Sequence, residues 1–231
     1  MKEDIFLQRM ISHEPKEGKV NPMSWGPVIT ISREYGCYGS EIADKLCTKI
    51  NALDPSTEWK DISSEILEEA SKKLNVNKEK ISHIFGANET PIIEDILKAF
   101  SNYDKYTSDF RIKKTISNVV RSFAEKGNVV IVGRASCVLA HDIPRAIHVR
   151  LTASFEWRVN QIAKRFDIKR EQAIEKVQEI DKHRIKFMEF YKGVRPDAEI
   201  YDVVYNRGTL STDAIVEGIY NLVIQKNILN K

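Results

Sequence analysis

A turn that contains two glycines, at residues 33–40, is the first place where this sequence could bind an anion. It follows the apolar, β-branched run 28–31, which predicts a buried strand. It precedes residues 40–50, where apolar side chains recur at helical spacing. Amide groups converge where a strand turns into a helix, and the helix N-terminus adds partial positive charge. We therefore expect the peptide NH groups between Arg33 and Ser40 to point inward together and to bind phosphate oxygens.

The side chains of this turn allow more than one interpretation. Gly36 and Gly39 permit positive φ and the close approach of an anion, but an ordinary tight turn has the same glycines. Cys37 is either a thiol activated by the helix N-terminus or, as we favour, a small residue that fills space. The residues expected to contact a phosphate group are Tyr35, Gly36, Cys37, Tyr38, Gly39, Ser40 and Glu41.

Two charged residues stand where predicted strands end. Arg134 follows the apolar run 128–132, which is typical of a strand buried on both faces. Its planar guanidinium could hold a phosphate through two bonds, and the alternative is an ion pair that faces solvent. Asp61 follows the shorter predicted strand 57–60. It fits a ligand-binding role and the role of a helix N-cap equally well.

Charged residues on predicted helices form a second group. Arg158 and Arg165 are two helical turns apart and share a face, as do Asp181 and Arg184, which are three residues apart. Pairs of this kind usually belong to a solvated helix surface. They could also place cations over a ligand.

The elements that must position these residues alternate along the chain. Predicted strands are followed by helical segments, which indicates an α/β protein with a parallel sheet covered on both faces and ligands at the carboxyl ends of the strands. The predicted strands are 28–31, 57–60, 128–132, 145–151 and 203–206. The clearest predicted helices are 40–50, 110–126, 154–166, 170–191 and 212–228.

Composition restricts the function classes. Hydrophobic residues make up 42% and charged residues 30%, which suits a globular protein. A net charge of +3 is too small to indicate a nucleic-acid partner. The three cysteines contain no CxxC pair, no apolar run has the length of a membrane span, and the N-terminus is too charged for a signal peptide. We expect a cytoplasmic protein with no membrane association.

Taken together, these segments resemble the cytidylate kinase-like family, a branch of the P-loop nucleoside monophosphate kinases. The resemblance covers about residues 28–220. It is carried in order by SREYG at 32–36, WKD at 59–61, VIVGRA at 130–135, LTA at 151–153, DKHR at 181–184 and YDVVYN at 201–206.

The family resemblance implies a three-layer α/β/α P-loop kinase-like fold with about five strands. Residues 1–26 would be an N-terminal arm and residues 27–231 one kinase-like domain. Within that domain the resemblance places an acceptor-side helical region at about 61–126 and lid-like helices at about 154–192. The arm and the apolar stripe of 110–126 could serve a homodimer or pack within one chain.

The activity that the resemblance implies is transfer of the ATP γ-phosphoryl, with Mg²⁺, to a nucleoside monophosphate, CMP being the first guess. Ser40 would hold the metal ion, and Asp61, Arg134 and Asp181 would bind the acceptor. The cations expected on the transferring group are Arg33, Arg158, Arg165 and Arg184. A nucleotide-binding regulatory module without competent catalysis and a kinase for another small phosphorylated acceptor remain as alternatives.

Three departures from the family pattern bear on turnover. Gly39 stands in the place of the phosphate-loop lysine, and Tyr38 stands in the place of the glycine before it. Val177 replaces an arginine that full cytidylate kinases carry. Because phosphoryl transfer depends on positioned positive charge, another cation must replace the lysine if the chain catalyses.

Overall fold

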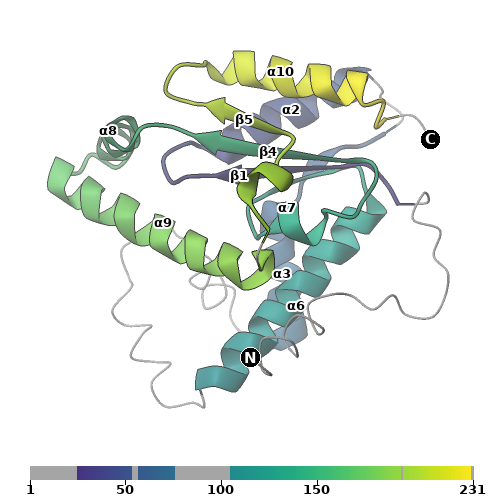
Figure 1. Ribbon diagram of the computed structural model, residues 1–231, viewed down its shortest axis with the longest axis horizontal. Coiled ribbons are helices and arrows are strands. Elements are labelled where there is room, and N and C mark those ends of the chain that lie inside the picture. Colours follow the sequence, from purple (N-terminus) through teal and green to yellow (C-terminus); the bar gives the residue numbers. More distant parts are fainter. Residues whose placement is uncertain (1–24, 54–56, 76–104, 194, 230–231) are drawn as a thin grey trace.

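The structure, a computed structural model, describes residues 25–53, 57–75, 105–193 and 195–229 (Figure 1). The predicted arm is almost wholly outside these residues, as is the middle of the predicted acceptor-side region, 76–104. Among the helices of the described residues, none combines the length and apolar character that a membrane span requires.

Five parallel strands of the described residues form one sheet, in the order β2-β3-β1-β4-β5. Their bounds are β1 Val28–Arg33, β2 Lys60–Asp61, β3 Val129–Val132, β4 Ala146–Thr152 and β5 Val203–Asn206. β1 is central, and Ile29 lies beside Val130 of β3 and Ile147 of β4. The carboxyl ends of β1, β3 and β4 therefore meet at one edge of the sheet. This is the edge at which the sequence predicts Asp61 and Arg134.

Helices cover both faces of this sheet. The helices are α2 Gly39–Leu53, α3 Ser63–Leu74, α6 Lys105–Lys126, α7 Ser136–Leu139, α8 Phe155–Phe166, α9 Arg170–Lys192 and α10 Thr212–Gln225, with a 3₁₀ turn, η2, at Asp197–Glu199. α2 and α10 cover one face, and α3, α6, α7 and part of α9 lie on the other (Figure 1). The predicted three-layer arrangement with a five-stranded parallel sheet is thus confirmed.

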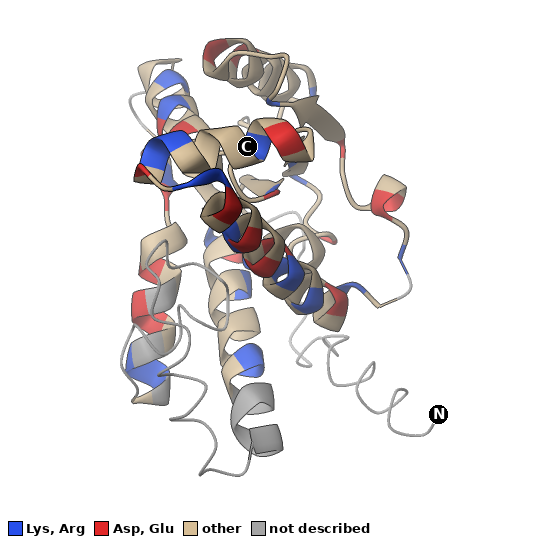
Figure 2. Cartoon of the chain, turned by 90° about the vertical axis from the view of Figure 1, so that its left-hand side faces the viewer, with Lys and Arg blue, Asp and Glu red and all other residues tan. Residues whose placement is uncertain are grey.

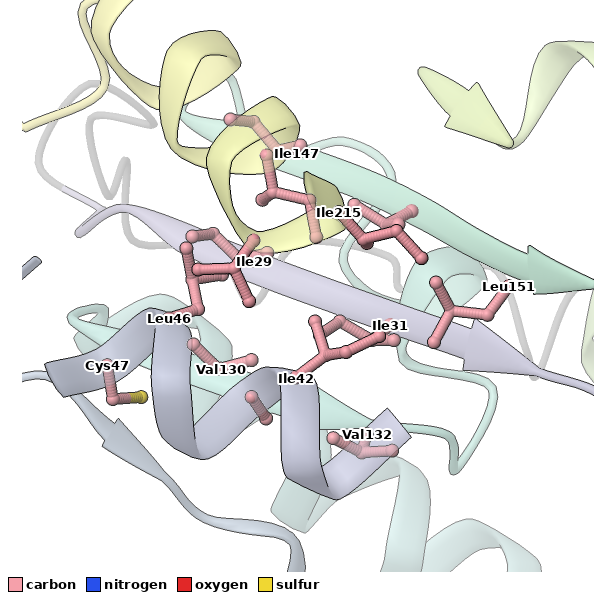
Figure 3. Packing of buried hydrophobic residues seen from close by; sticks show 14 of the residues in the cluster. Ile29, Ile31, Ile42, Leu46, Cys47, Val130, Val132, Ile147, Leu151 and Ile215 are labelled. Carbon is pink, nitrogen blue, oxygen red and sulfur yellow. The ribbon is translucent and has the colours of Figure 1, made fainter. Parts of the chain in front are cut away.

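The α2 face shows how the apolar pattern of the sequence produces this packing. Ile42 and Leu46, one helical turn apart on α2, lie against Ile29 and Ile31 of β1 (Figure 3). All four side chains are fully buried. Burying one such side chain stabilises the fold by about 1.5–3 kcal/mol. The packing fixes where α2 begins and so fixes the turn that precedes it.

The second strand is shorter and later than predicted: β2 contains only Lys60 and Asp61. The backbone of Trp59 bonds instead to the side chain of Asn51 on α2, through its NH at 2.8 Å and its carbonyl at 3.0 Å. Those bonds hold Trp59 against α2, so the pairing of β2 with β3 begins at Lys60.

Helices α8 and α9 pack together beyond the carboxyl ends of the strands; in Figure 1 α8 is seen nearly end-on and α9 runs across the view. Ser154 caps α8 by accepting a bond from the Trp157 NH at 3.3 Å. The pair has a small core of its own, in which Val159, Ile162 and Val177 are fully buried against Tyr35 of the turn. Val177, which replaces a family arginine, therefore serves packing here. Basic and acidic residues alternate along the outside of α9 (Figure 2).

Candidate functional site

The turn between β1 and α2 differs from our expectation in one respect: three of its amide groups bond within the protein. The Glu34 NH donates to the Leu151 carbonyl at 3.1 Å, and the Cys37 NH donates to the Glu34 carbonyl at 3.2 Å. The Tyr35 NH donates to Asp181 Oδ1 at 2.8 Å. The prediction that all NH groups of the turn point together at a ligand is therefore wrong for these three. The amides available to an anion are those at the start of α2, which lack partners within the helix.

Gly36 and Gly39 in the turn meet different structural requirements. Gly36 adopts φ +92°, and a Cβ there would lie 3.1 Å from the Arg158 backbone, so both conformation and space require glycine. Gly39 does not have positive φ. A Cβ at Gly39 would lie 3.1 Å from Val132 Cγ1, so close packing against β3 explains this glycine. The left-handed conformation belongs instead to Tyr38, at φ 48°.

Cys37 points into the core rather than toward a ligand. Its side chain is fully buried with the residues of β1 and α2. Burial, followed by the charge of Glu34, raises the pKa of its thiol to about 12. A reactive thiolate is therefore excluded, and the space-filling interpretation of Cys37 holds.

Arg158 and Asp181 hold the turn against the α8–α9 pair. Asp181 accepts bonds from the Tyr35 NH through Oδ1 and from Arg158 Nη1 through Oδ2. Arg158 also donates to the Tyr35 carbonyl at 3.2 Å and to the Ala153 carbonyl at 3.3 Å. Arg158 is buried, with all these bonds made inside the protein. The geometry thus gives both residues a supporting part behind the turn, and both also line a cavity beside α9.

Glu34, which our sequence reasoning did not include, completes this support. One carboxylate oxygen accepts bonds from Thr152 Oγ1 at 2.7 Å and from the Ala153 NH at 3.1 Å. The same oxygen lies 3.4 Å from Arg158 Nε. Its position in the sequence could have identified Glu34, because a charged residue that follows a buried strand was the reason for predicting Arg134 as a site residue.

Three guanidinium groups come together at the ends of β1 and β3 and on α9. They belong to Arg33, Arg134 and Arg184, and we call them the arginine cluster. Burial lowers the pKa of Arg134 to about 9, and the charge of Arg184 acts in the same direction. Burial, and next the charges of Arg184 and Arg134, lower the pKa of Arg33 well below its ordinary value. Like charges held together out of water favour an anion between them.

The backbone that carries Arg134 is strained. Gly133, Arg134 and Ala135 adopt φ of 78°, 61° and 53° in succession, a left-handed stretch that costs about 1–2 kcal/mol for each residue with a side chain. A Cβ on Gly133 would meet the guanidinium of Arg33, and φ of 78° is itself unfavourable for a residue with a side chain, so glycine lets Arg33 keep this position. Strain of this kind persists where the surroundings enforce it, and it concentrates at functional sites.

Asp61 ends β2, lies beside the arginine cluster and also contacts Ser63, the first residue of α3. Its Oδ1 accepts a bond from the Ser63 NH at 2.9 Å and another from Ser63 Oγ. Its negative charge raises the pKa of both Arg33 and Arg134, opposing the larger effect of burial. The structure therefore gives Asp61 the capping contact and places it near the cluster at the same time.

Two cavities open on either side of the arginine cluster. The loop cavity, of about 440 Å³, is lined by the turn and the start of α2 and is reached by Arg165. The α9 cavity, of about 430 Å³, is lined by α9 and by Arg150 and Tyr201. Four residues line both cavities: Arg33, Glu34, Arg134 and Arg184. Ligands in the two cavities would therefore meet at the cluster.

The loop cavity has groups that suit Mg²⁺ bound with a nucleotide. Ser40 and Asp44, one turn apart on α2, both line it, as does Glu41. Among the described residues, no group of three or more histidine, cysteine or acidic side chains could hold a metal alone. Magnesium usually keeps waters and takes one or two protein ligands together with phosphates, so this donor set fits.

Arg207, after β5, is a further residue that sequence reasoning missed. It donates from Nε to the Cys37 carbonyl at 3.3 Å and lies 6.0 Å from the centre of the Trp157 ring. It follows a strand end, as Arg134 does. Its partners are distant in sequence, but its position directly after a strand was a local signal that could have identified it.

A model of the cytidylate kinase-like family matches residues 28–209. The chain is 33% identical over 129 residues to a cytidylate kinase of Sulfurisphaera tokodaii, covering 54% of this chain and 71% of that protein. It is 32% identical over 118 residues to a cytidylate kinase of Ignicoccus hospitalis, covering 50% and 67%. A solved structure of an uncharacterized protein from Eubacterium ventriosum shares the fold, with TM-score 0.60 and 22% identity over 86% of this chain and 98% of that one.

Proposed function

The chain belongs to the cytidylate kinase-like family, and from this premise we propose that it transfers the γ-phosphoryl group of ATP to a nucleoside monophosphate. Family membership and the fold support a nucleotide kinase. CMP is the first acceptor to test, because two similar proteins are cytidylate kinases.

The observation that carries the proposal is the arginine cluster shared by two cavities. In-line phosphoryl transfer needs a donor and an acceptor that approach one phosphorus atom from opposite sides. We assign the loop cavity to the donor phosphates and the α9 cavity to the acceptor. This departs from the family resemblance, which put the acceptor beside residues 61–126 and made α9 part of the lid; the reason is that the α9 cavity shares the arginine cluster with the loop cavity. Arg33, Arg134 and Arg184 line both, so their charges face the point where the two phosphates would meet.

The chemistry that these residues supply is mainly electrostatic. Arg134 would hold the acceptor phosphate, and Arg33 and Arg184 would neutralise the charge that develops during transfer. Ser40 and Asp44 would hold Mg²⁺, which shields the donor phosphates when bound. The acceptor is already an anionic phosphate, so no protein base is required to activate it.

An inactive nucleotide-binding module is the second candidate function. The observations in its favour are the three amides of the turn that bond within the protein and the tyrosine at position 38. Such a module would bind nucleotide without turnover.

A coupled assay with Mg-ATP and a panel of nucleoside monophosphates tests the proposal. We expect turnover with at least one pyrimidine monophosphate and loss of that turnover in Arg134→Ala. Arg170→Ala, which removes an exposed ion pair with Glu156 at the start of α9, is the matched control and should keep wild-type activity. Nucleotide binding without turnover for any acceptor would favour the module. Turnover with a different phosphorylated metabolite would keep the kinase and reject the nucleotide acceptor.

A further inference from the structure

Tyr38 stands in the turn where a phosphate loop has glycine, and it is bound to α8 at two points. Its hydroxyl donates to the Gln161 carbonyl at 3.1 Å. The Arg165 guanidinium lies over its ring, 4.4 Å from the ring centre. Gln161 and Arg165 are one helical turn apart, so the tyrosine spans a single turn of α8.

We propose that Tyr38 is a positioning residue that holds Arg165 over the loop cavity, where Arg165 supplies the positive charge that the missing lysine would otherwise provide. This inference rests on the proposed function, because it assigns the loop cavity to the donor phosphates. Tyr38, Arg165 and the start of α2 all line that cavity. Gly39 occupies the lysine position itself and cannot contribute a charge.

The backbone of Tyr38 supports a role other than folding. A residue with a side chain at φ 48° is less stable by about 1–2 kcal/mol than glycine at the same place. The exposed cation–π contact returns about 0.5–1 kcal/mol and the hydrogen bond to Gln161 about 0.5–1.5 kcal/mol. The cost and the gains nearly cancel, so the tyrosine adds little to the stability of the fold. Its contribution is a fixed place for the long side chain of Arg165.

Arg165 needs such a partner because it is exposed near the end of α8. A long side chain at an exposed position samples many rotamers, and ordering it on binding an anion reduces affinity. Contact with the Tyr38 ring restricts those rotamers before the ligand arrives.

The contrary interpretation is that the ring of Tyr38 obstructs the loop cavity. The two interpretations predict opposite results for Tyr38→Gly. If the ring positions Arg165, the variant binds polyphosphate more weakly. If the ring obstructs the cavity, the variant binds it more tightly.

Equilibrium binding of inorganic tripolyphosphate measures this without requiring turnover. We expect Tyr38→Gly and Arg165→Ala each to weaken binding about five- to tenfold, with unfolding midpoints close to the wild type. The double variant should be no weaker than Arg165→Ala alone, because both changes remove the same contact. Tyr38→Phe, which keeps the ring, should stay within about twofold of wild type.

The matched control is Lys164→Ala, which removes an exposed cation beside Arg165 in sequence and should leave binding within about twofold of wild type. Additive losses in the double variant, unchanged binding in Tyr38→Gly, or tighter binding in Tyr38→Gly would each overturn the inference. Failure of the proposed function would appear separately, as tripolyphosphate binding without turnover of any acceptor. If turnover is found, a rise in KM for ATP in Tyr38→Gly that Tyr38→Phe reverses supports the same conclusion.

Discussion

The turn between β1 and α2 and the arginine cluster lie within the same site, but their charges are arranged in opposite ways. Behind the turn, Asp181 and Glu34 each contact Arg158, so opposite charges meet. In the cluster, Arg33, Arg134 and Arg184 lie together, and the charge of Arg184 lowers the pKa of the other two, so like charges meet. The first arrangement is complete without a ligand and fixes a shape. The second would be stabilised by an anion. We propose that the cluster is the principal anion-binding element and that the turn positions it.

Removing a charge from the support behind the turn should have the largest effect on stability. Asp181→Ala leaves the buried Arg158 without its closest carboxylate partner, which we expect to lower the free energy of unfolding by about 3–5 kcal/mol. Urea denaturation measures this. The control Glu156→Ala breaks an exposed pair with Arg170 and should change stability by less than about 1 kcal/mol. Similar, small losses in both variants would remove the contrast between a supporting turn and a binding cluster.

Removing one charged side chain from the arginine cluster should affect catalysis more than folding stability. Arg134→Ala relieves charge repulsion between the buried guanidinium of Arg134 and the partly buried ones of Arg33 and Arg184, so its stability should match or exceed that of the wild type. Loss of one charge-stabilising donor typically lowers kcat by about 100- to 1000-fold, which corresponds to about 3–4 kcal/mol. Steady-state kinetics with the best acceptor, alongside urea denaturation, separate the two effects. A destabilised Arg134→Ala with a normal kcat would reverse the assignment.

A buried histidine in the sheet allows a pH test of stability that involves neither the turn nor the arginine cluster. His148 on β4 is buried and bonded to Thr30 at 2.8 Å. Burial lowers its pKa to about 4, from an ordinary value of 6.5. Below pH 6.5 the imidazole of His148 is protonated in the unfolded chain, but in the folded chain it stays neutral until about pH 4. The free energy of unfolding therefore falls as the pH is lowered from 6.5 to about 4. By about pH 4.5 we expect a loss of about 2–3 kcal/mol.

Urea denaturation at about pH 7 and about pH 4.5 checks this expectation. In His148→Gln the loss should be much smaller, whereas His183→Gln, at an exposed position on α9, should behave like the wild type. An equal loss in His148→Gln and in the wild type would show that other groups cause the acid sensitivity.

The parts of the fold that local pattern determines were predictable from the sequence. The runs 28–31 and 128–132 contain enough consecutive apolar residues to identify buried strands, and Arg134 could be placed at a sheet edge from its position after one of them. The same reasoning applied to Glu34 and Arg207 would have found them as well. β2 was misplaced because the bond partner of Trp59, Asn51, lies in a preceding helix.

The use of each group within the site was not predictable in the same way. The amides of Glu34 and Tyr35 bond to Leu151 and Asp181, which lie far along the chain. Whether an NH group faces a ligand or a distant carbonyl depends on packing that no local pattern encodes. For the same reason Arg158 and Arg165, which share a helix face, have different surroundings: one is buried behind the turn and the other is exposed over the loop cavity.

Calorimetric titration with inorganic phosphate, in the absence of nucleotide and magnesium, tests most directly whether the arginine cluster binds the anion. The wild type should bind phosphate, and Arg134→Ala should bind it at least about tenfold more weakly. Ser40→Ala, which alters only the start of α2 beside the turn, should bind close to the wild type. If instead Arg134→Ala keeps wild-type affinity while Ser40→Ala loses it, the anion site belongs to the turn and not to the cluster.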